Sequence, residues 1–551
     1  MMARVDPAGG RAKDASAGVQ AAGAPVTGAL AAGTEARTAG TEAQAAGMEA
    51  RVTGSRAPDG TVGALAQDGA VVGEARDGVA VSEARDNAVV SAAQDGAGVS
   101  ETSEAAADAE AATEAADADN AAPAAVPLLA PRDGMPPLIV TAEALDQAAR
   151  ALAAGHGPVA VDAERASGFR YGHRAFLVQL RREGAGTMLI DPVACPDLSG
   201  IDTALAGVEA VLHAASQDLP CLAEVGYRPT KLFDTELAGR LLGYPRVGLG
   251  TLVETVLGLS LEKSHSAADW STRPLPADWL LYAALDVEVL VELRDSLAQQ
   301  LVEQGKTEWA QQEFAAVLAA SPPPPRAEPW RRTSGIHRVR NRRGLSIVRE
   351  LWQERDRLAR QRDLSPTRVL SDAAIIEAAR TVPKDAAALS TVTGFTSRGA
   401  RRHATEWLRA IQRATATVDA DLPDSSAPAG DGPPPAHRWQ ERDPAAARRL
   451  AMVRAAVVAL AAEHGLPAEN LLLPDTVRRL AWQPPDPVSP ESVRAALASH
   501  GARQWQIEVT AAALSAALLT AAEPDPEPDS DPEPDSGSGS DPEPGPGSVG
   551  A

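Results

Sequence analysis

Cysteine is nearly absent from this chain, since its 551 residues include only Cys195 and Cys221. Two thiols cannot build a disulfide framework, and such low cysteine usage suits a reducing compartment. The sequence also has no CxxC pair and no His/Cys cluster with the spacing of a structural zinc site. We therefore expect a cytoplasmic protein without disulfides or structural zinc.

Long apolar runs and nucleotide-binding motifs are missing as well. The apolar stretch AAALSAALLTAA at 511–522 is shorter than a bilayer requires, and the start MMARVDPAGGRAK lacks the apolar centre of a secretory signal. There is no Walker lysine motif, and Gly248-Leu-Gly250 lacks the strand and the third glycine of a dinucleotide fingerprint. We expect no membrane span, no nucleotide cofactor and no helicase activity.

The net charge is concentrated at the two ends of the chain. Residues 1–135 carry nine basic and 20 acidic side chains, and residues 523–551 carry no basic and nine acidic ones, in a chain of formal charge −22. Both ends are of low complexity and contain no aromatic residue. They cannot bury enough apolar surface to offset chain entropy, which predicts disorder. The overall acidity therefore does not exclude a nucleic-acid partner.

The middle of the chain is long enough for two or three folded domains. Stretches rich in proline separate its apolar segments. The predicted order is an α/β domain at 136–320, a linker at 321–335, an all-helical domain at 336–415, a linker at 416–437 and a second helical domain at 438–522.

Short apolar segments predict the strands of the first domain. The runs LIV (138–140), PVAVDAE (158–164), AFLVQL (175–180) and TMLIDP (187–192) follow one another closely, and AVLHA (210–214) comes later. Three strands in series with short connections favour an antiparallel meander. Helical patterns follow at QDLPCLAEVG, at FDTELAGRLLGY and from Asp278 to about Gln304, which indicates an α/β domain with a mixed sheet.

The two helical domains share a sequence pattern but differ in charge. The 22 residues from Leu358 align without gaps on those from Leu460, which suggests a duplicated module. Residues 326–415 hold 20 basic and nine acidic side chains, a net charge of +11, whereas residues 136–325 hold 14 and 24, a net charge of −10. A basic surface of this kind attracts phosphate backbones by counterion release. An ordinary solvated helical face is the alternative.

Two carboxylates stand at the end of the apolar run VAVDAE. Asp162 and Glu164 share one face of a strand, because side chains alternate. An isolated DxE usually marks a solvent-facing strand end, but charges that end an apolar run are costly to bury without a partner. Asp218 follows a predicted buried strand in HAASQD, where a helix N-cap is the simpler interpretation.

Tyr282 and Asp286 lie four residues apart in the predicted helix YAALD, and therefore on one helical face. An amphipathic helix with a tyrosine at its rim would show the same pattern. In a catalytic interpretation, the hydroxyl orients an attacking water and the carboxylate binds a metal. Phosphodiester hydrolysis uses two divalent cations roughly 3.5–4 Å apart. Mg²⁺ and Mn²⁺ prefer clustered oxygen ligands, so the acids predict a site for two such cations.

The order and context of these motifs resemble a known family. Six segments resemble ribonuclease D of the DEDD exonucleases, in the branch with a tyrosine in the third motif: VAVDAE, AFLVQL, HAASQDLPCL, FDTELAGRLLG, LEKSHSAADWSTRPL and LLYAALDVEVLVEL. This resemblance covers roughly residues 138–320. The segment LWQERDRLARQRDLSPTRVLSDAAIIEAAR is similar to the helicase-and-RNase-D C-terminal (HRDC) domain, and residues 438–522 look like a diverged second copy.

The resemblance implies a ribonuclease H-like fold and 3′→5′ hydrolysis of RNA. It assigns Asp162 and Glu164 to the first exonuclease motif, Asp218 to the second, and Tyr282 with Asp286 to the third. Asp162 would bridge both metals, Glu164 and Asp286 would hold the metal on the nucleophile side, and Asp218 would hold the metal on the leaving-group side.

Three further residues precede the helix of Tyr282. Lys263, Trp270 and Arg273 are candidates for contact with substrate phosphate or base, although a structural role in the loop is equally compatible with the sequence. His213 occupies a position in the second motif where many proofreading exonucleases have Asn, which argues against a proofreading role.

Together the sequence predicts a cytoplasmic 3′→5′ exoribonuclease that depends on divalent metals. Its expected substrate is RNA with a single-stranded 3′ end, such as a transfer-RNA precursor, and its expected product is nucleoside 5′-monophosphate. Two alternatives remain open: a DNA exonuclease of repair, which uses the same site chemistry, and a non-catalytic RNA-binding protein with a degenerate nuclease domain. The complete set of four acids and Tyr282 argues against the second alternative.

Overall fold

The computed structural model describes residues 125–522, except 263–264, 323, 427–429 and 431. The predicted disorder of the acidic ends therefore falls outside the described residues for 1–124 and 523–551. Residues 125–135, which composition had grouped with the disordered end, are ordered and include the short strand β1 (Val126–Pro127). Ordered structure thus extends at least about ten residues further toward the N-terminus than predicted, because backbone pairing with a distant strand holds these residues.

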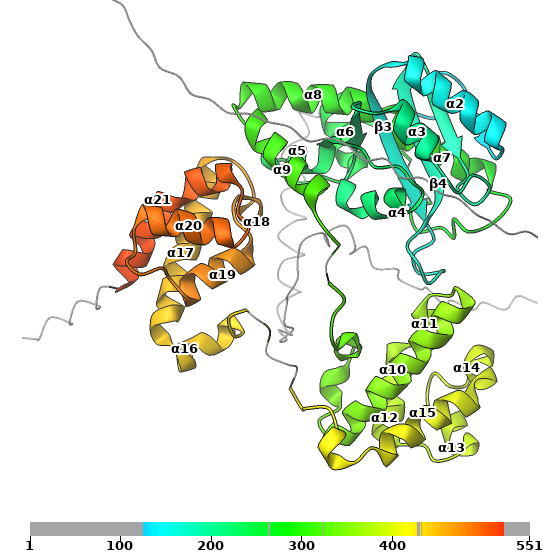
Figure 1. Ribbon diagram of the computed structural model, residues 1–551, viewed down its shortest axis with the longest axis vertical. Helices are drawn as coiled ribbons and strands as arrows, with labels where there is room; N and C mark the ends of the chain where they lie inside the picture. Colours follow the sequence, from blue (N-terminus) through cyan, green and yellow to red (C-terminus); the bar gives the residue numbers. More distant parts are fainter. Residues whose placement is uncertain (1–124, 263–264, 323, 427–429, 431, 523–551) are drawn as a thin grey trace, which may run out of the picture. The chain divides into compact units, whose positions relative to one another are not determined.

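A six-stranded mixed sheet forms the centre of the first domain (Figure 1). Its strand order is β2-β5-β4-β3-β6-β7. Strands β3, β4 and β5 pair antiparallel, whereas β2, β6 and β7 join parallel to their neighbours. The strands are β2 (Leu138–Ile139), β3 (His156–Arg165), β4 (Ala175–Glu183), β5 (Gly186–Ile190), β6 (Glu209–Leu212) and β7 (Lys231–Asp234).

The structure confirms the antiparallel meander and the mixed α/β sheet that the sequence predicted. The buried runs of β3 and β4 explain the apolar sequences VAV and AFLV, since both faces of these central strands are covered. No strand is predicted from the sequence at β7, because Phe233 and Asp234, the second half of this strand, fall within the predicted helix FDTELAGRLLGY. Its last residue, Asp234, is instead the N-cap of that helix.

Helices surround this sheet. They are α2 (Ala142–Ala154), α3 (Ser199–Ala204), α4 (Leu219–Glu224), α5 (Thr235–Leu241), α6 (Leu249–Leu257), α7 (Ala277–Glu288), α8 (Leu290–Glu303) and α9 (Thr307–Ala319). Helix α7 packs on β3, β4 and β5. The single helix predicted from Asp278 to Gln304 is in fact two, since α7 ends and α8 begins at Val289.

A strap formed by residues 125–134 crosses this domain. Its strand β1 pairs parallel with β8 (Leu259–Ser260), through hydrogen bonds from the Val126 amide to the Gly258 carbonyl at 2.8 Å and from the Leu128 amide to the Ser260 carbonyl at 3.0 Å. Further along, Arg132 forms an ion pair with Glu292 of α8, and its amide donates to Glu288 of α7 at 3.2 Å. The strap is therefore bonded to β8, which precedes α7 in the chain, to α7 itself and to α8, which follows it.

The second segment is entirely helical, as predicted. It contains α10 (Arg342–Arg362), α11 (Pro366–Val369), α12 (Asp372–Thr381), α13 (Ala386–Thr391), α14 (Arg398–Arg402) and α15 (Ala404–Ala416). The apolar stripe of α10 packs against α12 and α15 around the buried side chains of Leu351, Ile375 and Trp407. The side chains of Asn341 and Ser371 cap the starts of α10 and α12 by accepting hydrogen bonds from the amides of Gly344 and Ala374.

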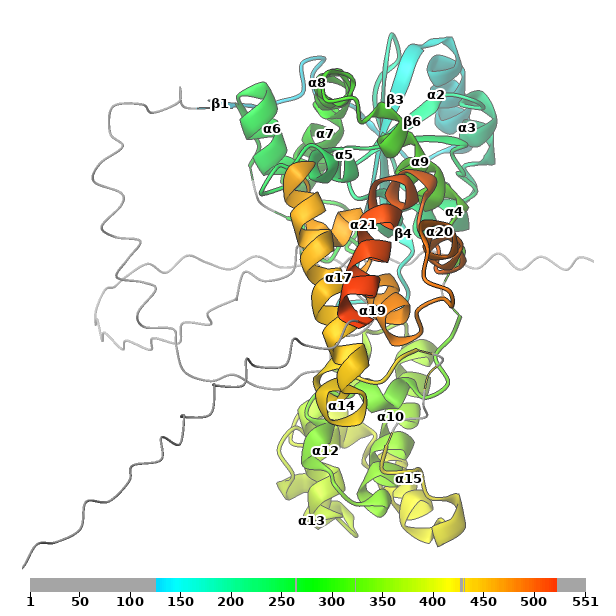
Figure 2. The ribbon, with the colours of Figure 1, turned by 90° about the vertical axis from the view of Figure 1, so that its left-hand side faces the viewer.

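The third segment is also entirely helical, and Figure 2 shows its helices in orange to red. Its helices are α16 (Trp439–Arg442), α17 (Pro444–Glu463), α18 (Ala468–Leu471), α19 (Pro474–Trp482), α20 (Pro490–Ser499) and α21 (Gln504–Ala522). The starts of α18 and α19, at 468 and 474, follow those of α11 and α12, at 366 and 372, by the same 102 residues as Leu460 follows Leu358. The gapless alignment of the two segments thus coincides with equivalent helix starts.

Helix α21 is longer than its apolar sequence run suggested. Its 19 residues are long and apolar enough to cross a membrane, by length and composition only. More than half of the helix is buried, however, and it packs against α17 and α20. This burial is typical of the core helix of a helical domain.

Candidate active site

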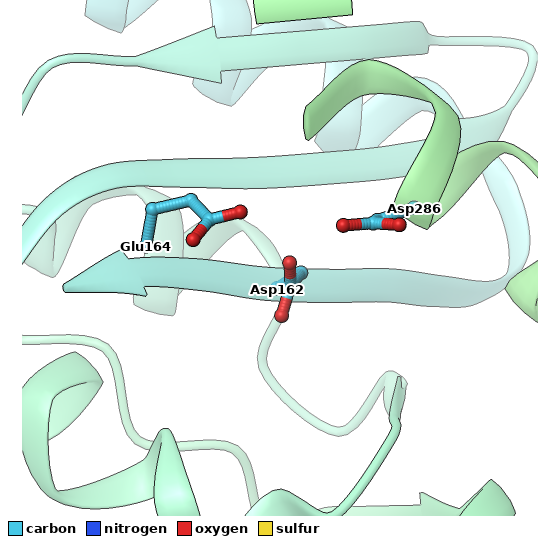
Figure 3. A group of neighbouring side chains, drawn as sticks. All are labelled: Asp162, Glu164 and Asp286. Atoms are coloured by element: carbon cyan, nitrogen blue, oxygen red, sulfur yellow. The ribbon is translucent and has the colours of Figure 1, made fainter. Parts of the chain in front are cut away.

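Three carboxylates converge where β3 meets α7. Oxygen atoms of Asp162, Glu164 and Asp286 all lie within 4.8 Å of one another. Figure 3 shows Asp162 and Glu164 on the same strand and Asp286 on the helix beside it, with the three carboxylate groups directed toward a common space. The side chain of Glu164 is buried, and those of Asp162 and Asp286 are half-buried. The structure therefore brings together three of the four acids that the sequence singled out.

Strand geometry explains two members of this cluster. Asp162 and Glu164 are two residues apart in β3, so their side chains leave the same face of the sheet. The antiparallel ladder pairs Asp162 with Gln179 and Glu164 with Leu177, and the register then shifts before Arg165. The regular alternation that sequence reasoning assumed thus holds as far as Glu164 and ends immediately after it.

Helix α7 supplies the other two predicted residues. Tyr282 and Asp286 are one turn apart, and a hydrogen bond joins the Tyr282 hydroxyl to the Asp286 carboxylate. The small side chains of Ala283 and Ala284 are fully buried beside Leu177 of the sheet. Their size allows the helix backbone to approach the strands closely, which places Asp286 against Asp162.

Burial and mutual repulsion oppose the charged forms of these acids. Desolvation raises the pKa of Asp162, and together with the charge of Asp162 it raises the pKa of Asp286. The pKa of Glu164 lies well above its usual range, first because of desolvation and then because of the charges on Asp162, Asp286 and Asp218. A divalent cation would offset both effects. Three hard oxygen donors at this spacing fit such a cation, and the fold implies divalent-metal use.

Asp218 lies apart from the three converging acids and has a different partner. It stands between a short 3-10 turn and α4, is nearly buried, and makes an ion pair of 3.2 Å with the guanidinium of Arg165. It accepts no side-chain capping bond from α4, although the sequence suggested an N-cap. Desolvation and the charge of Asp162 raise its pKa, whereas Arg165 lowers it.

Asp234, which sequence reasoning missed, holds the turn that leads to Asp218. Its carboxylate accepts hydrogen bonds from the amides of Ala214 and Ala215 at 3.2 and 2.8 Å, and it also caps α5. Ala214 adopts a left-handed backbone with φ of 57°, a conformation that side chains disfavour and that these bonds offset. Burial raises the pKa of Asp234 to about 6. The sequence signal for this role was an aspartate directly before a helical pattern.

His213, on the same turn, is held neutral. Its Nδ1 lies 2.9 Å from the Thr235 hydroxyl, and burial followed by the charge of Arg240 lowers its pKa to about 4. The imidazole therefore adds no positive charge beside the acids at neutral pH.

Gln179 is a second residue that sequence reasoning missed. It pairs directly with Asp162 across the strands and is fully buried, yet neither atom of its side-chain amide has a hydrogen-bond partner among the described residues. A polar residue within the apolar run AFLVQL was the available signal. An unpaired buried amide is costly, which indicates a polar partner such as a water or a bound ligand near the carboxylates.

The three expected substrate contacts have different outcomes. Lys263 lies outside the described residues. Trp270 is fully buried and packs against Trp279 and Tyr282, with ring centroids 5.3 and 6.4 Å apart. This burial favours the structural role in the loop, which the sequence left open beside contact with RNA.

The guanidinium of Arg273 likewise makes its hydrogen bonds to other groups of the protein. Its guanidinium donates two hydrogen bonds of 2.8 Å to Asp191 and further bonds to the carbonyls of Phe176, Trp270 and Thr272. These bonds fasten the loop that precedes α7 to the sheet. Sequence alone could not show this, because Asp191 lies 82 residues away.

A cavity of about 300 Å³ opens beside Tyr282 and Asp286. It is lined by Leu128, Leu129, Leu261, Glu262, His265, Asp278, Leu281, Tyr282, Leu285 and Asp286. One wall is thus formed by the strap, where Leu129 is 71% exposed although it is apolar. On the opposite side, the His265 ring meets the Tyr282 ring edge-on at 6.0 Å.

Comparison with protein families assigns each of the three ordered segments. Residues 137–302 match a family described as 3′-5′ exonuclease, residues 344–411 match the HRDC domain, and residues 432–518 match a family described as 3′ to 5′ exonuclease C-terminal domain.

Relatives and solved structures agree with this assignment. Ribonuclease D of Gluconacetobacter diazotrophicus is 31% identical over 341 residues, which cover 59% of this chain and 81% of the relative. Ribonuclease D of Acidiphilium cryptum is 35% identical over 315 residues, 55% of this chain and 78% of the relative.

Two crystal structures span most of the folded part. A protein from Bifidobacterium adolescentis is 40% identical, with a TM-score of 0.65, over 72% of this chain and 100% of that chain. Escherichia coli RNase D, described as an exoribonuclease involved in structured RNA processing, is 25% identical, with a TM-score of 0.52, over 70% of this chain and 98% of its own. With its acidic site beside α7 and its helical domains, this chain belongs to the ribonuclease D family of 3′-5′ exoribonucleases.

Proposed function

We propose that the cluster of Asp162, Glu164 and Asp286 hydrolyses RNA from its 3′ end with two divalent cations, Mg²⁺ or Mn²⁺, and releases nucleoside 5′-monophosphates. The convergence of the three carboxylates within 4.8 Å, with Tyr282 one turn away from Asp286, carries this proposal. In this proposal Asp162 would serve both cations, Glu164 and Asp286 would serve the cation on the nucleophile side, and Asp218 would serve the cation on the leaving-group side.

The cations would activate the attacking water and neutralise charge on the leaving oxygen. The protein contributes position and exclusion of water. Burial raises the pKa of Tyr282, so its hydroxyl stays protonated, and its single hydrogen can be donated to the scissile phosphate or to the attacking water in place of Asp286. The cavity beside it is a suitable place for the terminal nucleotide.

The substrate we propose is RNA with a single-stranded 3′ end, such as a transfer-RNA precursor. A single-stranded end allows the terminal nucleotide to leave its neighbours and enter a narrow cavity without the cost of unpairing. The +11 charge of residues 326–415 supports a role of the HRDC segment in holding the RNA backbone.

The decisive assay uses matched RNA and DNA oligonucleotides with identical 3′ tails, in Mg²⁺, Mn²⁺ or EDTA. We expect release of 5′-monophosphates from RNA with either cation and none in EDTA. Asp162→Asn and Asp286→Asn should each abolish hydrolysis while the circular dichroism spectrum is retained.

Asp295→Asn on α8 is the matched control, because this carboxylate is 62% exposed and only pairs with Arg294. Unchanged hydrolysis in a folded Asp162 or Asp286 variant would refute the site. Faster cleavage of DNA than of RNA would leave the site intact but reassign the substrate to DNA.

A further inference from the structure

Arg165 is the one cation that contacts an acid of the proposed site among the ion pairs of the described residues. Its guanidinium lies 3.2 Å from Asp218, and its side chain is 25% exposed while that of Asp218 is 8% exposed. The same nitrogen reaches the Gln217 side chain at 3.5 Å, at the rim of the site. The arginine therefore bridges the solvent edge and the buried carboxylate.

A local irregularity of the sheet accompanies this contact. The ladder pairs Glu164 with Leu177 but Arg165 with Ala175, so Phe176 is an extra residue on β4. Such a bulge bends the strand and changes the direction of the side chains next to it. Arg165 is the last residue of β3, where this change in direction is possible without breaking the strand.

The ion pair with Arg165 neutralises the negative charge of Asp218, which the neighbouring carboxylates repel. Asp218 is desolvated and lies near the carboxylates of Asp162 and Asp234. A guanidinium offers a planar set of donors that suits a carboxylate, and it neutralises Asp218 without any metal. Among the residues that the structure describes, the three converging acids have no comparable cation: Arg165 acts on Asp162 and Glu164 only as a weaker, longer-range charge.

We propose that Arg165 is a positioning residue that stands in for a divalent cation at Asp218 and has to leave this carboxylate when such a cation binds there. The inference rests on the proposed role of Asp218 on the leaving-group side. It makes the two halves of the site unequal, since the side of Asp162, Glu164 and Asp286 is ready for a cation, whereas the side of Asp218 already holds a competing positive charge.

The test measures Mn²⁺ binding directly, by electron paramagnetic resonance of free Mn²⁺, in the full-length protein without RNA. Arg165→Gln removes the competing charge, so we expect the weaker Mn²⁺ ion to bind about three- to tenfold more tightly, as for the loss of a partly exposed ionic contact. Arg165→Lys keeps the charge, so its affinity for Mn²⁺ should lie between that of Arg165→Gln and that of the wild type. The matched control is Arg150→Gln on the exposed face of α2, which makes the same change in net charge.

Two comparisons separate this idea from a purely structural role and from the proposed function itself. In an Asp218→Asn background, Arg165→Gln should no longer change the affinity for the weaker ion. Unchanged or weaker Mn²⁺ binding in Arg165→Gln would overturn the inference, and so would a raised KM for RNA with unaltered Mn²⁺ affinity, which would make Arg165 a direct RNA contact. Failure of the proposed function would appear elsewhere, as tight Mn²⁺ binding that survives Asp162→Asn.

Discussion

At the scale of single residues, the candidate active site consists of carboxylates whose negative charges repel one another when no cation is bound. Asp162, Glu164 and Asp286 are desolvated and close together, so the pKa of each carboxyl is raised. The protein tolerates this because the rest of the domain core is apolar and well packed. Stored repulsion of this kind favours the binding of a divalent cation over the empty state.

This arrangement predicts how the stability of the metal-free protein depends on pH. A carboxyl whose pKa is raised in the folded state binds its proton more tightly there than in the unfolded chain. Its contribution to stability is therefore complete below the ordinary carboxyl pKa of about 4 and is lost as the pH rises through the raised pKa. His213 has the opposite effect. Because burial lowers its pKa to about 4, its contribution to folding stability is complete above its ordinary pKa of about 6.5 and is lost as the pH falls from there through about 4.

Asp286→Asn isolates the contribution of the acids. In EDTA, the melting temperature of this variant should exceed that of the wild type by an amount that grows as the pH rises from 5 to 8, and saturating Mg²⁺ should remove or reverse the difference. Differential scanning fluorimetry over this pH range measures both effects. A difference that does not change with pH in EDTA would show that Asp286 is not under electrostatic strain.

Tyr282 provides a separate prediction about chemistry. Tyr282→Phe removes the hydroxyl at Asp286 but keeps the ring that packs on Trp270 and His265. We expect kcat to fall by roughly 10²-fold, as for the loss of a positioned hydrogen-bonding group, with unchanged affinity for Mn²⁺. Rapid-quench kinetics at saturating metal, together with a metal titration, distinguish the two quantities. A large shift in metal affinity with a normal saturated rate would give Tyr282 a different role.

At the scale of elements, α7 and the strap around it define the site more than any single loop. The helix is fixed to the sheet through Ala283 and Ala284, and the loop before it is fastened by Arg273 and Asp191. The strap then closes the cavity from the other side with Leu128 and Leu129. The exposure of Leu129 at this cavity is explained if a nucleobase packs on it.

The strap therefore has a predicted function that the acidic sequence before it does not share. A protein that begins at residue 125 should match the full chain in KM and kcat for a single-stranded RNA, because the removed part is of low complexity. A protein that begins at residue 135 loses the pairing of β1 with β8 and one wall of the cavity. We expect its KM to rise several-fold, roughly what the loss of one stacking surface of about 1–3 kcal/mol permits.

Leu129→Ser in the full chain controls for the general effects of truncation, because this side chain is 71% exposed and its loss leaves the core unchanged. It should raise KM in the same direction, but less than removal of the whole strap. Identical KM values for the proteins that begin at residues 125 and 135 would contradict a role of the strap in binding RNA.

At the scale of the whole molecule, the net charge differs in sign between two of the segments. The exonuclease segment at 136–325 has a net charge of −10 and the HRDC segment at 326–415 one of +11. Many of these arginines pair with acids, for example Arg355 with Asp372 and Arg413 with Glu350. Arg398, Arg401 and Arg402 of α14 are instead exposed, and their side chains have no ion-pair or hydrogen-bond partner within the described residues. Because the three share one short helix, they form a group of basic side chains that can contact phosphate together.

A triple change of these three arginines to glutamine should weaken the binding of long RNA by a catalytically inactive Asp286→Asn protein. The slope of log affinity against log salt should fall by up to about 0.7 for each arginine that neutralises a phosphate of single-stranded RNA. Fluorescence anisotropy from low to high salt gives both slopes.

The matched control for this experiment changes Arg442, Arg454 and Arg494 to glutamine, which are exposed residues of the third segment. It alters the total charge equally. The same slope for the α14 variant and the unmodified protein would mean that this helix does not bind RNA.

Local patterns were sufficient to predict much of the fold and three quarters of the acidic site. The alternation of β3 placed Asp162 and Glu164 on one face, and the helical spacing placed Tyr282 and Asp286 together, because both relations depend only on neighbours in the chain. The meander of β3, β4 and β5 followed from short connections in the same way. The matching helix starts of the second and third segments correspond to a gapless alignment of the two sequences, in which equivalent residues are 102 positions apart.

Tertiary structure alone decided the rest, because it depends on residues far apart in sequence. The pairing of Arg165 with Asp218 spans 53 positions, as their numbers show, and the bonds of Arg273 to Asp191 span 82. Strand β1 of the strap is ordered by β8, more than 130 positions later, so composition assigned it wrongly to the acidic end. Sequence determines which groups each element offers, whereas burial and long-range pairing determine which of these groups remain free to meet a cation or an RNA.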